Sequence, residues 1–327
     1  MILAGDIGGT KTNLALYEIK ESVLNTVIQH QYLNQDFSSL NAMFSAFKEH
    51  YAIEKIDAAS FGVAGPVIDG YCNITNLPWE ISRDALKDYW QIDKVYLLND
   101  LEATAYGMLY LNEDEFEDLN PMGRLVDGNR AVLAAGTGLG EAMLFFDGES
   151  YYPVASEGGH SDFAPLTTQQ DDLLKWMRHR YPEHVSYERV LSGPGISLLY
   201  EFLLEHSDAI ESELFVPIPE GKDRNAIITD RALNEEDPLC LEVLSLFAEI
   251  YGAEAGNLAL KTMSLGGVYI GGGIAPKILC DLTKEHFMKG FSAKGRFREM
   301  LENMQVKMSL NPETALLGAA HYARDRL

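Results

Sequence analysis

Short hydrophobic runs separated by polar turns open the chain and predict strands. Residues 1 to 4 and 11 to 17 fit two strands, with a glycine-rich segment between them. Residues 22 to 34 alternate loosely enough for a third strand, and residues 40 to 50 carry large hydrophobic side chains at helical spacing. Strands followed by a helix indicate an α/β layer.

The opening pattern returns in the middle of the chain. Residues 130 to 135 and 141 to 146 fit two strands, and the glycine turn 136 to 140 lies between them. The acidic, loop-like segment 112 to 129 comes just before this repeat and is the best candidate for a domain boundary. The repeat suggests two related half-structures, each with a glycine loop, on opposite sides of one cleft.

Further elements follow the same patterns. A strand is predicted over 94 to 98, and a helix follows over 101 to 111. Pro238 and the pair Gly266-Gly267 bracket a helix of more than twenty residues with a hydrophobic stripe. A short strand at 268 to 270 and a terminal helix at 314 to 324 complete the chain.

Composition and charge limit the classes of function that the chain can have. The 327 residues have room for two domains, and 46% hydrophobic with 23% charged residues fit a soluble globular protein. The net charge of −23 disfavours nucleic acid or an anionic membrane as a partner. Three widely spaced cysteines suggest neither a disulfide framework nor a zinc site. With no signal peptide or membrane span in the pattern, we expect a cytoplasmic protein.

The first glycine segment has the chemistry of a phosphate loop. Gly8 and Gly9 lack side chains, so their backbone N–H groups can approach phosphate oxygens, helped by the hydroxyl of Thr10. Asp6, at the end of a strand, is placed to hold Mg²⁺ directly or through a water molecule. Because Lys11 begins a second strand, neither a P-loop nor a dinucleotide-binding turn fits. An ordinary hairpin turn is the alternative.

Two later glycine segments could serve the same ligand. The turn with Gly136, Thr137 and Gly138 repeats the first loop in the second half of the chain. In the segment after residue 270, Gly272 and Gly273 allow the backbone to lie flat against a ligand.

Several polar residues follow predicted strands or lie in dense polar loops. Asn99 and Asp100 end a strand where ligands bind in open α/β folds, although both residue types also cap helices. Glu157 and His160 share a short glycine loop that could bind hydroxyl groups, and no spacing in it indicates zinc. Glu188 precedes a Gly-Pro-Gly turn. The alternatives are that Glu157 and His160 belong to an ordinary surface loop and that Glu188 is an exposed acid on a helix.

In the order of these motifs the chain resembles the bacterial glucokinase family of the hexokinase, actin and heat-shock ATPase superfamily. The resemblance covers almost the whole length, through both glycine loops, the Leu98-Asn99-Asp100 and Glu157-Gly158-Gly159-His160 motifs, Glu188, the Gly271-Gly272-Gly273 segment and Ala315 to Ala320. It implies an α/β fold of two ribonuclease-H-like (actin-like ATPase) domains flanking a central cleft. Residues 1 to 110 and about 301 to 327 would form the small domain, and residues 111 to 300 the large one.

The resemblance also implies an activity and its residues. The enzyme would be a glucokinase that transfers a phosphoryl group from ATP, with Mg²⁺ near Asp6, to the 6-hydroxyl of glucose in the first step of glycolysis. Asp100 would accept the proton of that hydroxyl. Glucose would be bound by Asn99, Asp100, Glu157, His160 and Glu188. ATP would be bound by Asp6, Gly8, Gly9, Thr10, Lys11, Gly136, Thr137, Gly138, Gly272 and Gly273. Family members are often homodimers.

Other functions on this scaffold are open. The substrate could be another hexose, such as mannose or N-acetylmannosamine, because the sequence does not fix the sugar. A non-catalytic sugar sensor could keep the hydroxyl ligands but has no need of Asp100, and an ATPase switch has no need of the polar loops. A neighbouring family of sugar kinases and repressors shares Gly-Gly-Thr-Lys, and Lys11 leans that way. Its cysteine cluster after the histidine is absent here, which disfavours a DNA-binding regulator.

Overall fold

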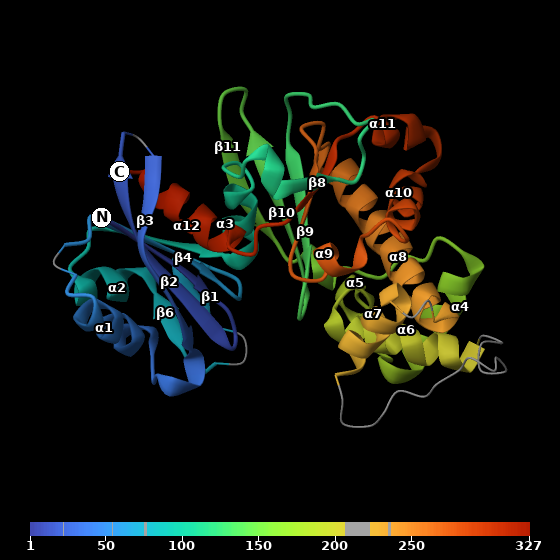
Figure 1. Cartoon of the computed structure of the whole chain (residues 1–327), viewed down its shortest axis with the longest axis horizontal. Helices are drawn as coiled ribbons and strands as arrows, with labels where there is room; N and C mark the ends of the chain where they lie inside the picture. Colours follow the sequence, from blue (N-terminus) through green and yellow to red (C-terminus); the bar gives the residue numbers. More distant parts are fainter. Residues whose placement is uncertain (22, 54, 75–76, 207–222, 235–236) are drawn as a thin grey trace. The chain divides into compact units, whose positions relative to one another are not determined.

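The computed structural model describes residues 1–21, 23–53, 55–74, 77–206, 223–234 and 237–327, which form two compact units (Figure 1). The first unit contains Met1–Glu115, Ala142–Ala155 and Asn311–Leu327. The second unit contains Phe116–Glu141 and Ser156–Leu310. The first unit is thus assembled from segments that are far apart in the sequence.

The first unit is built on a sheet of five strands among the described residues, in the order β3-β2-β1-β4-β7. Antiparallel pairing joins β1 to β2 and β2 to β3, whereas β4 is parallel to both β1 and β7. The strands are β1 (Ile2–Ile7), β2 (Lys11–Lys20), β3 (Val23–Leu33), β4 (Ala58–Val63) and β7 (Lys94–Asn99). The beginning of the chain therefore lies at the centre of this sheet.

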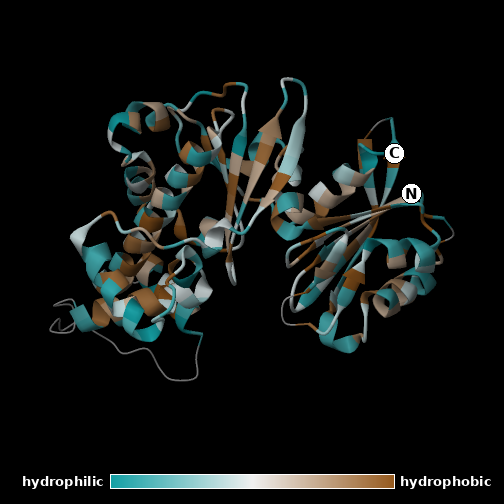
Figure 2. Ribbon diagram, turned by 180° about the vertical axis from the view of Figure 1, so that it is seen from behind, coloured by the Kyte–Doolittle hydropathy of each residue, from teal (hydrophilic) through white to brown (hydrophobic). Residues whose placement is uncertain are grey.

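Alternate residues of β1 face opposite sides of the sheet, as the two-residue period of a strand requires. Ile2 and Ala4 belong to the hydrophobic cluster that includes α12 (Thr314–Arg324). Leu3 belongs to the larger cluster that includes α1 (Leu40–His50). Figure 2 shows hydrophobic residues along the strands of the sheets and hydrophilic residues on the helices that cover them. Both faces of the central strands β1 and β4 are thus buried, whereas the edge strand β3 is mostly exposed.

Helix α3 (Asp100–Gly107) packs against α12 at close range. A Cβ atom at Gly318 would lie 1.8 Å from the carbonyl oxygen of Ala103, and one at Gly107 would lie 2.0 Å from the carbonyl oxygen of Thr314. No side chain fits at such distances, so the contact requires glycine at both positions. This contact anchors α3 to α12.

A second sheet has six strands within the described ranges, in the order β11-β10-β9-β12-β13-β8. β12 is parallel to β9 and β13, and β8 is antiparallel to β13. The strands are β8 (Phe116–Asp118), β9 (Arg130–Ala135), β10 (Leu139–Phe146), β11 (Tyr151–Ser156), β12 (Val268–Gly271) and β13 (Val306–Ser309). Apart from β8, this order repeats that of the first sheet, as the duplicated sequence pattern predicts.

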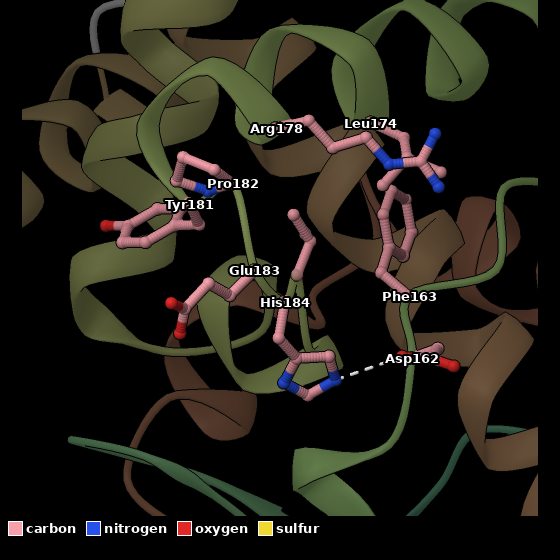
Figure 3. A pocket seen from close by; sticks show the side chains of 9 residues that line it. Asp162, Phe163, Leu174, Arg178, Tyr181, Pro182, Glu183 and His184 are labelled. Carbon is pink, nitrogen blue, oxygen red and sulfur yellow. Dashed lines mark ion pairs between the residues drawn. The ribbon is translucent and has the colours of Figure 1, made fainter.

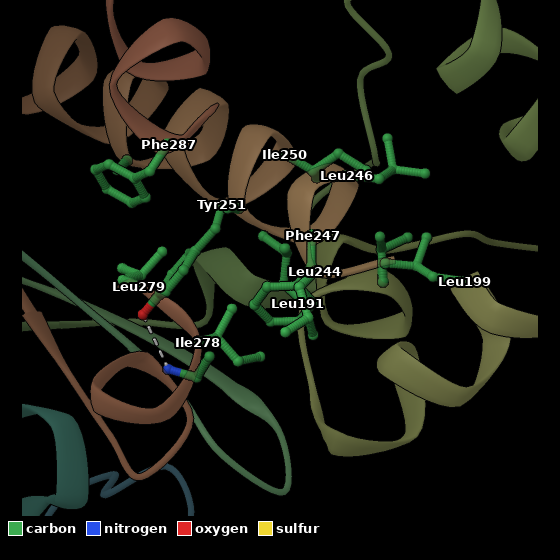
Figure 4. Packing of buried hydrophobic residues seen from close by; sticks show 14 of the residues in the cluster. Leu191, Leu199, Leu244, Leu246, Phe247, Ile250, Tyr251, Ile278, Leu279 and Phe287 are labelled. Carbon is green, nitrogen blue, oxygen red and sulfur yellow. Dashed lines mark hydrogen bonds between the residues drawn. The ribbon is translucent and has the colours of Figure 1, made fainter. Parts of the chain in front are cut away.

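The hydrophobic core of the second unit surrounds α8 (Pro238–Thr262). Proline occupies the start of the helix, as expected, and the middle of the helix is buried on nearly all sides rather than along one stripe. Figure 4 shows Phe247 and Tyr251 of α8 among other large side chains of this core. The Tyr251 hydroxyl accepts a hydrogen bond from the amide of Ala135 at 3.2 Å. Helix α8 therefore holds the end of β9 where the second glycine turn begins.

The other elements are short strands and surrounding helices. They are β5 (Tyr71–Asn73), β6 (Glu80–Ser82), α2 (Arg83–Trp90), α4 (Thr168–Arg180), α5 (Tyr187–Val190), α6 (Gly193–His206), α7 (Arg224–Asn234), α9 (Ala275–Ile278), α10 (Lys284–Ser292) and α11 (Arg298–Glu302). In the part of the chain that the structure describes, no helix has the length and apolar character needed to cross a membrane.

Most predicted elements agree with the structure, and the differences are local. The helix predicted over 101 to 111 already ends at Gly107. The segment 112 to 129, expected to be a loop, contains the short strand β8, whose residues are too few and too acidic to show a strand pattern. The third strand spans Val23–Leu33, and Ser22 lies outside the described residues.

Candidate active site

The first glycine segment forms a tight hairpin turn between β1 and β2. The amide of Gly8 donates a hydrogen bond to the carbonyl oxygen of Lys11 at 3.0 Å. Gly8 and Gly9 are partly exposed, and Thr10 and Lys11 are exposed. A strand rather than a helix follows the turn, so the exclusion of a P-loop is confirmed. The tip of the turn, with Gly9 and Thr10, is therefore accessible to a ligand.

A buried asparagine that the sequence analysis missed holds this hairpin. Asn34 is 1% exposed and lies in a short 3-10 helix after β3. Its side-chain amide donates to the carbonyl oxygen of Gly8 at 2.8 Å, and its side-chain oxygen accepts from the hydroxyl of Thr12 at 2.7 Å. Its backbone amide donates to the carbonyl oxygen of Thr10 at 3.0 Å. The only signal in the sequence is an asparagine after a strand, which is common in ordinary turns.

Asp6 lies at the end of β1, beside the hairpin. The side-chain amide of Asn13 is 3.5 Å from its Oδ2 atom, a long hydrogen bond. Burial raises the pKa of the Asp6 carboxyl above its ordinary value of 3.8, and the Asn13 bond opposes this only in part. Among the described residues Asp6 has no ion pair. A carboxylate with uncompensated charge and hard oxygen atoms is suited to Mg²⁺.

Asn99 ends β7 and caps α3. Its side-chain oxygen accepts a hydrogen bond from the amide of Leu101 at 2.9 Å, and its side-chain amide donates to the carbonyl oxygen of Gly65 at 3.1 Å. Glu102 completes a capping box by accepting from the amide of Asn99 at 2.9 Å. The capping role that the sequence left open therefore belongs to Asn99.

Asp100 is the first residue of α3 and is partly buried. Its Oδ1 atom accepts a hydrogen bond from the amide of Leu101 at 2.9 Å. A negative charge interacts favourably with the N-terminus of a helix. Burial, with a smaller contribution from the Asp100 charge, raises the pKa of the Cys72 thiol to about 11. Asp100 is thus a carboxylate at a strand end, a common place for ligands in α/β folds.

The second glycine turn joins β9 to β10 and lies in the second unit. The amide of Gly136 donates to the carbonyl oxygen of Gly138 at 2.8 Å, which closes the turn, and the amide of Gly193 donates to the carbonyl oxygen of Gly136 at 2.9 Å. Thr137 is exposed at the tip. The turn is therefore tied to the start of α6.

Glu188, in α5, contacts this turn directly. Its Oε2 atom accepts a hydrogen bond from the amide of Leu139 at 3.1 Å. A Cβ atom at Gly138 would lie 2.4 Å from the same oxygen, so glycine is needed for the carboxylate to approach. The second glycine turn and one predicted sugar ligand are thus adjacent.

The structure brings Glu157, His160 and Glu188 together in the second unit. His160 Nε2 is 3.9 Å from Glu157 Oε2, and His160 Nδ1 is 3.9 Å from Glu188 Oε1. Glu157 and His160 are exposed, and Glu188 is partly exposed. Two carboxylates and an imidazole offer both acceptors and donors to neighbouring hydroxyl groups, which is the chemistry of a sugar site.

Backbone pairing explains why these distant residues meet. Segment 161 to 163, just after His160, runs alongside segment 185 to 187, just before Glu188. The amide of Tyr187 donates to the carbonyl oxygen of Ser161 at 3.0 Å, and the amide of Phe163 donates to the carbonyl oxygen of Val185 at 2.9 Å. This short antiparallel pairing holds the glycine loop and α5 side by side.

A small hollow of about 200 Å³ lies beside this pairing (Figure 3). Arg178, Tyr181 and Phe163 are among its lining residues, and His184 Nε2 forms an ion pair with Asp162 Oδ1 at 3.0 Å across it. The sequence-predicted sugar ligands Glu157, His160 and Glu188 do not line this hollow. We therefore do not assign the sugar to it.

The third glycine segment follows β12. Gly272 has a φ of +80°, and a Cβ atom there would lie 2.4 Å from the carbonyl oxygen of Ala135, the last residue of β9. Gly272 and Gly273 are both exposed. Their backbone therefore lies beside the start of the second glycine turn.

The predicted residues are divided between the units. Asp6, the first glycine hairpin, Asn99 and Asp100 belong to the first unit. The second and third glycine segments, Glu157, His160 and Glu188 belong to the second unit. The two phosphate-loop candidates occupy equivalent places in the two sheets, each after the central strand of the shared order.

Known proteins with similar sequences are glucokinases. The model of the Glucokinase family matches residues 3–326. The glucokinase of Synechocystis sp. is 40% identical over 341 residues, which cover 97% of this chain and 96% of that protein.

Solved structures agree with the fold. A glucokinase from an Antarctic psychrotroph has a TM-score of 0.84 and 31% identity, covering 99% of this chain and 98% of that chain. A ROK family glucokinase from Streptomyces griseus, in complex with glucose and AMPPNP, shares the fold with a TM-score of 0.66 at 18% identity, covering 99% of each chain. The predicted fold class, two ribonuclease-H-like α/β domains, is confirmed. This chain belongs to the glucokinase family of enzymes.

Proposed function

We propose that this enzyme phosphorylates the 6-hydroxyl group of glucose with ATP. We also propose that its predicted site residues bind glucose, ATP and Mg²⁺ and accept the proton of the 6-hydroxyl group. One observation carries the proposal: within a member of the glucokinase family, Glu157, His160 and Glu188 converge beside a glycine turn. Sugar ligands next to a phosphate loop suit transfer of a phosphoryl group to a sugar.

Glucose is bound by hydrogen bonds to its hydroxyl groups. Glu157, His160 and Glu188 supply acceptors and a donor, and Asn99 and Asp100 are assigned as further sugar ligands. Asn99 already uses one side-chain hydrogen and one lone pair for Gly65 and Leu101, so one of each is left for a sugar hydroxyl.

Asp100 acts as the base. Its carboxylate, stabilised at the N-terminus of α3, orients the 6-hydroxyl group and takes its proton. The sugar oxygen forms a bond to the γ-phosphorus while the bond from that phosphorus to the β,γ-bridging oxygen breaks, which releases ADP. Most of the catalysis comes from positioning and charge stabilisation.

ATP is held by backbone amides. We assign the phosphates to the two glycine turns with Gly8, Gly9 and Thr10 and with Gly136, Thr137 and Gly138, and the adenosine to Gly272 and Gly273. Asp6 would hold Mg²⁺, directly or through water, and the bound ion would neutralise charge on the phosphates. Lys11 is exposed at the same hairpin and adds a positive charge near them.

Turnover with a panel of sugars tests the proposal. The purified enzyme is given ATP, Mg²⁺ and glucose, mannose, fructose or N-acetylmannosamine, and ADP release is followed in a coupled assay. We expect the highest kcat/KM for glucose. A higher value for another sugar would identify a different hexose kinase, and glucose binding without turnover of any sugar would identify a sensor.

We further propose that the enzyme acts in the first step of glycolysis, in the cytoplasm, as a homodimer without a nucleic-acid or membrane partner. All three cysteines, which lie in the described part of the chain, are free thiols, as is usual in a reducing compartment. Light scattering coupled to gel filtration tests the dimer.

A further inference from the structure

Two buried acidic side chains lie near the predicted sugar ligands of the second unit, Glu141 beside Gly158 and Glu254 beside Asn257. Glu141 on β10 is 2% exposed, and Glu254 on α8 is fully buried. The Oε1 atom of each accepts no hydrogen bond among the described residues. Lys261 Nζ lies 3.5 Å from Glu254 Oε1, but Glu141 has no ion pair within the same residues. Burial of an acceptor without a donor is costly, so this arrangement requires an explanation.

A proton on one of the two carboxyl groups would supply a hydrogen-bond donor that the buried oxygen atoms lack. If Glu141 is a neutral carboxylic acid, its O–H group can donate a hydrogen bond to the neighbouring carboxylate of Glu254. Burial, and then the neighbouring charge of Glu254, raises the pKa of Glu141 to about 8, with the Lys261 charge opposing. The neutral form of Glu141 is therefore the main one at neutral pH.

The pair is connected to the predicted sugar ligands on two sides. A Cβ atom at Gly158 would lie 2.1 Å from Glu141 Oε2, so the backbone of the loop with Glu157 and His160 rests on this carboxyl group. On the other side, the side-chain amide of Asn257 donates to Glu254 Oε2 at 2.8 Å and lies 3.0 Å from the hydroxyl of Tyr187. Tyr187 immediately precedes Glu188.

Building on the proposed function, we propose that Glu141 is a positioning residue. Its neutral carboxyl group, bonded to Glu254, supports the loop of Glu157 and His160 and holds these two side chains close to Glu188. Because Glu141 follows the second glycine turn directly, it links the sugar ligands to the phosphate loop. It does not touch glucose, and it acts through the loop.

Other ionisable groups lie around the pair. On α8 they are Tyr251 and Lys261. Tyr187 comes from α5, and its pKa is raised by burial. Lys294, after α10, donates to Asn257 at 2.7 Å, and burial lowers its pKa. The groups that face Glu141 and Glu254 from the packed elements are Tyr187, Tyr251, Lys261 and Lys294.

Ionisation of Glu141 would place two buried anions against each other and push the loop away. We therefore expect KM for glucose in the wild type to rise at least about fivefold from pH 7 to pH 9, with KM for ATP changing less. Glu141→Gln carries a permanent donor for Glu254 in the same shape, so its KM for glucose should match the wild type at pH 7 and stay flat to pH 9.

Two further variants complete the experiment. Glu254→Gln offers an amide donor to an ionised Glu141 and should also flatten the profile, which keeps the test valid if Glu141→Gln does not fold. Glu149→Gln changes an exposed glutamate in the turn after β10 and should keep the wild-type profile. A flat wild-type profile, or a Glu141→Gln profile with the same rise as the wild type, would overturn the proposal.

Hydrogen exchange separates this inference from the proposed function. The peptide covering residues 156 to 160 is followed by mass spectrometry at pH 7 and pH 9, with exchange corrected for its intrinsic pH dependence. We expect protection to fall at pH 9 in the wild type and to persist in Glu141→Gln. This result would stand even if glucose proved not to be the substrate, whereas equal protection in both proteins at pH 9 would refute the positioning role.

Discussion

The Glu188 carboxylate accepts a hydrogen bond from the amide of Leu139, 3.1 Å away, and so joins a predicted sugar ligand to the second glycine turn. Its other oxygen faces His160. One side chain therefore contacts both the proposed phosphate loop and the proposed sugar site. The closeness of the two sites depends on Gly138, which leaves room for the carboxylate.

This relationship predicts different effects for two substitutions. Glu188→Gln can still accept from Leu139 but loses its charge, so KM for glucose should rise by the equivalent of about 1 to 3 kcal/mol while KM for ATP stays nearly constant. Gly138→Ala, whose Cβ atom would collide with the carboxylate, should raise both KM values. Steady-state kinetics with each substrate varied checks this. Glu183→Gln, an exposed change in the same unit, is the control, and an unchanged KM for glucose in Glu188→Gln would place the sugar elsewhere.

The assignment of Asp100 as base predicts a folded but slow Asp100→Asn variant. Because Asn99 supplies the side-chain cap of α3, the thermal unfolding temperature should change little. The amide cannot take the 6-hydroxyl proton, so kcat should fall at least about a hundredfold while glucose binding remains detectable. Calorimetry and turnover assays check both parts, with Asp93→Asn as an exposed control. Turnover within a few-fold of the parent would remove Asp100 from the mechanism.

The hydrogen bonds of Asn34 to the first hairpin predict that its substitution weakens the binding of ATP selectively. Asn34→Ala removes the side-chain bonds to Gly8 and Thr12, so the first hairpin should loosen and KM for ATP should rise about tenfold, with KM for glucose little changed. Asn25→Ala, at an exposed position on β3, should behave like the wild type. Equal effects of Asn34→Ala on both substrates would indicate general unfolding rather than loss of a phosphate loop.

Asp6 predicts how the enzyme depends on Mg²⁺. A chelator should abolish activity, and Asp6→Asn should need a Mg²⁺ concentration higher by about tenfold or more for half-maximal turnover, because a carboxylate ligand is lost. Removal of a buried charge should leave the unfolding temperature unchanged or raise it. Titration with Mg²⁺ at saturating ATP measures this, and an identical Mg²⁺ requirement in Asp6→Asn would exclude Asp6 as a metal ligand.

Glu141 predicts a pH dependence of stability. Below its ordinary pKa of 4.5 the carboxyl is protonated in both the folded and the unfolded chain, and between pH 4.5 and about 8 only the folded chain keeps the proton. The stabilisation is therefore fully present below pH 4.5 and is lost as the pH rises to about 8. Glu141→Gln lacks this loss, so its unfolding temperature should exceed that of the wild type by a margin that grows from pH 5 to pH 8. A constant margin would argue against a buried neutral carboxyl.

Sequence pattern predicted the fold where local signals were strong. Short hydrophobic runs located β1 and β2, proline and glycine marked the ends of α8, and the repeated glycine turn predicted two related sheets. The family and its enzymatic function, phosphorylation of glucose by ATP, are confirmed through the comparisons. The roles of the individual site residues stay predictions.

Other features depend on contacts between distant segments, and no local pattern reports these. Asn34 can form hydrogen bonds to the first hairpin only because β3 ends beside that hairpin. Glu141 and Glu254 look like ordinary strand and helix acids in sequence, and only the folded structure shows that both are buried. Asn99 and Asp100 are adjacent and chemically similar, so the sequence could not say which of them caps α3.

The packing of α12 on β1 also orders events during synthesis. Strand β1, with Ile2 and Ala4, is translated before the second unit, yet the helix that covers these residues is translated only after the entire second unit. The second sheet and its α8 core can form while the first sheet still has one bare hydrophobic face. Because α12 covers that face, the core of the first unit can be completed only after the second unit has been translated.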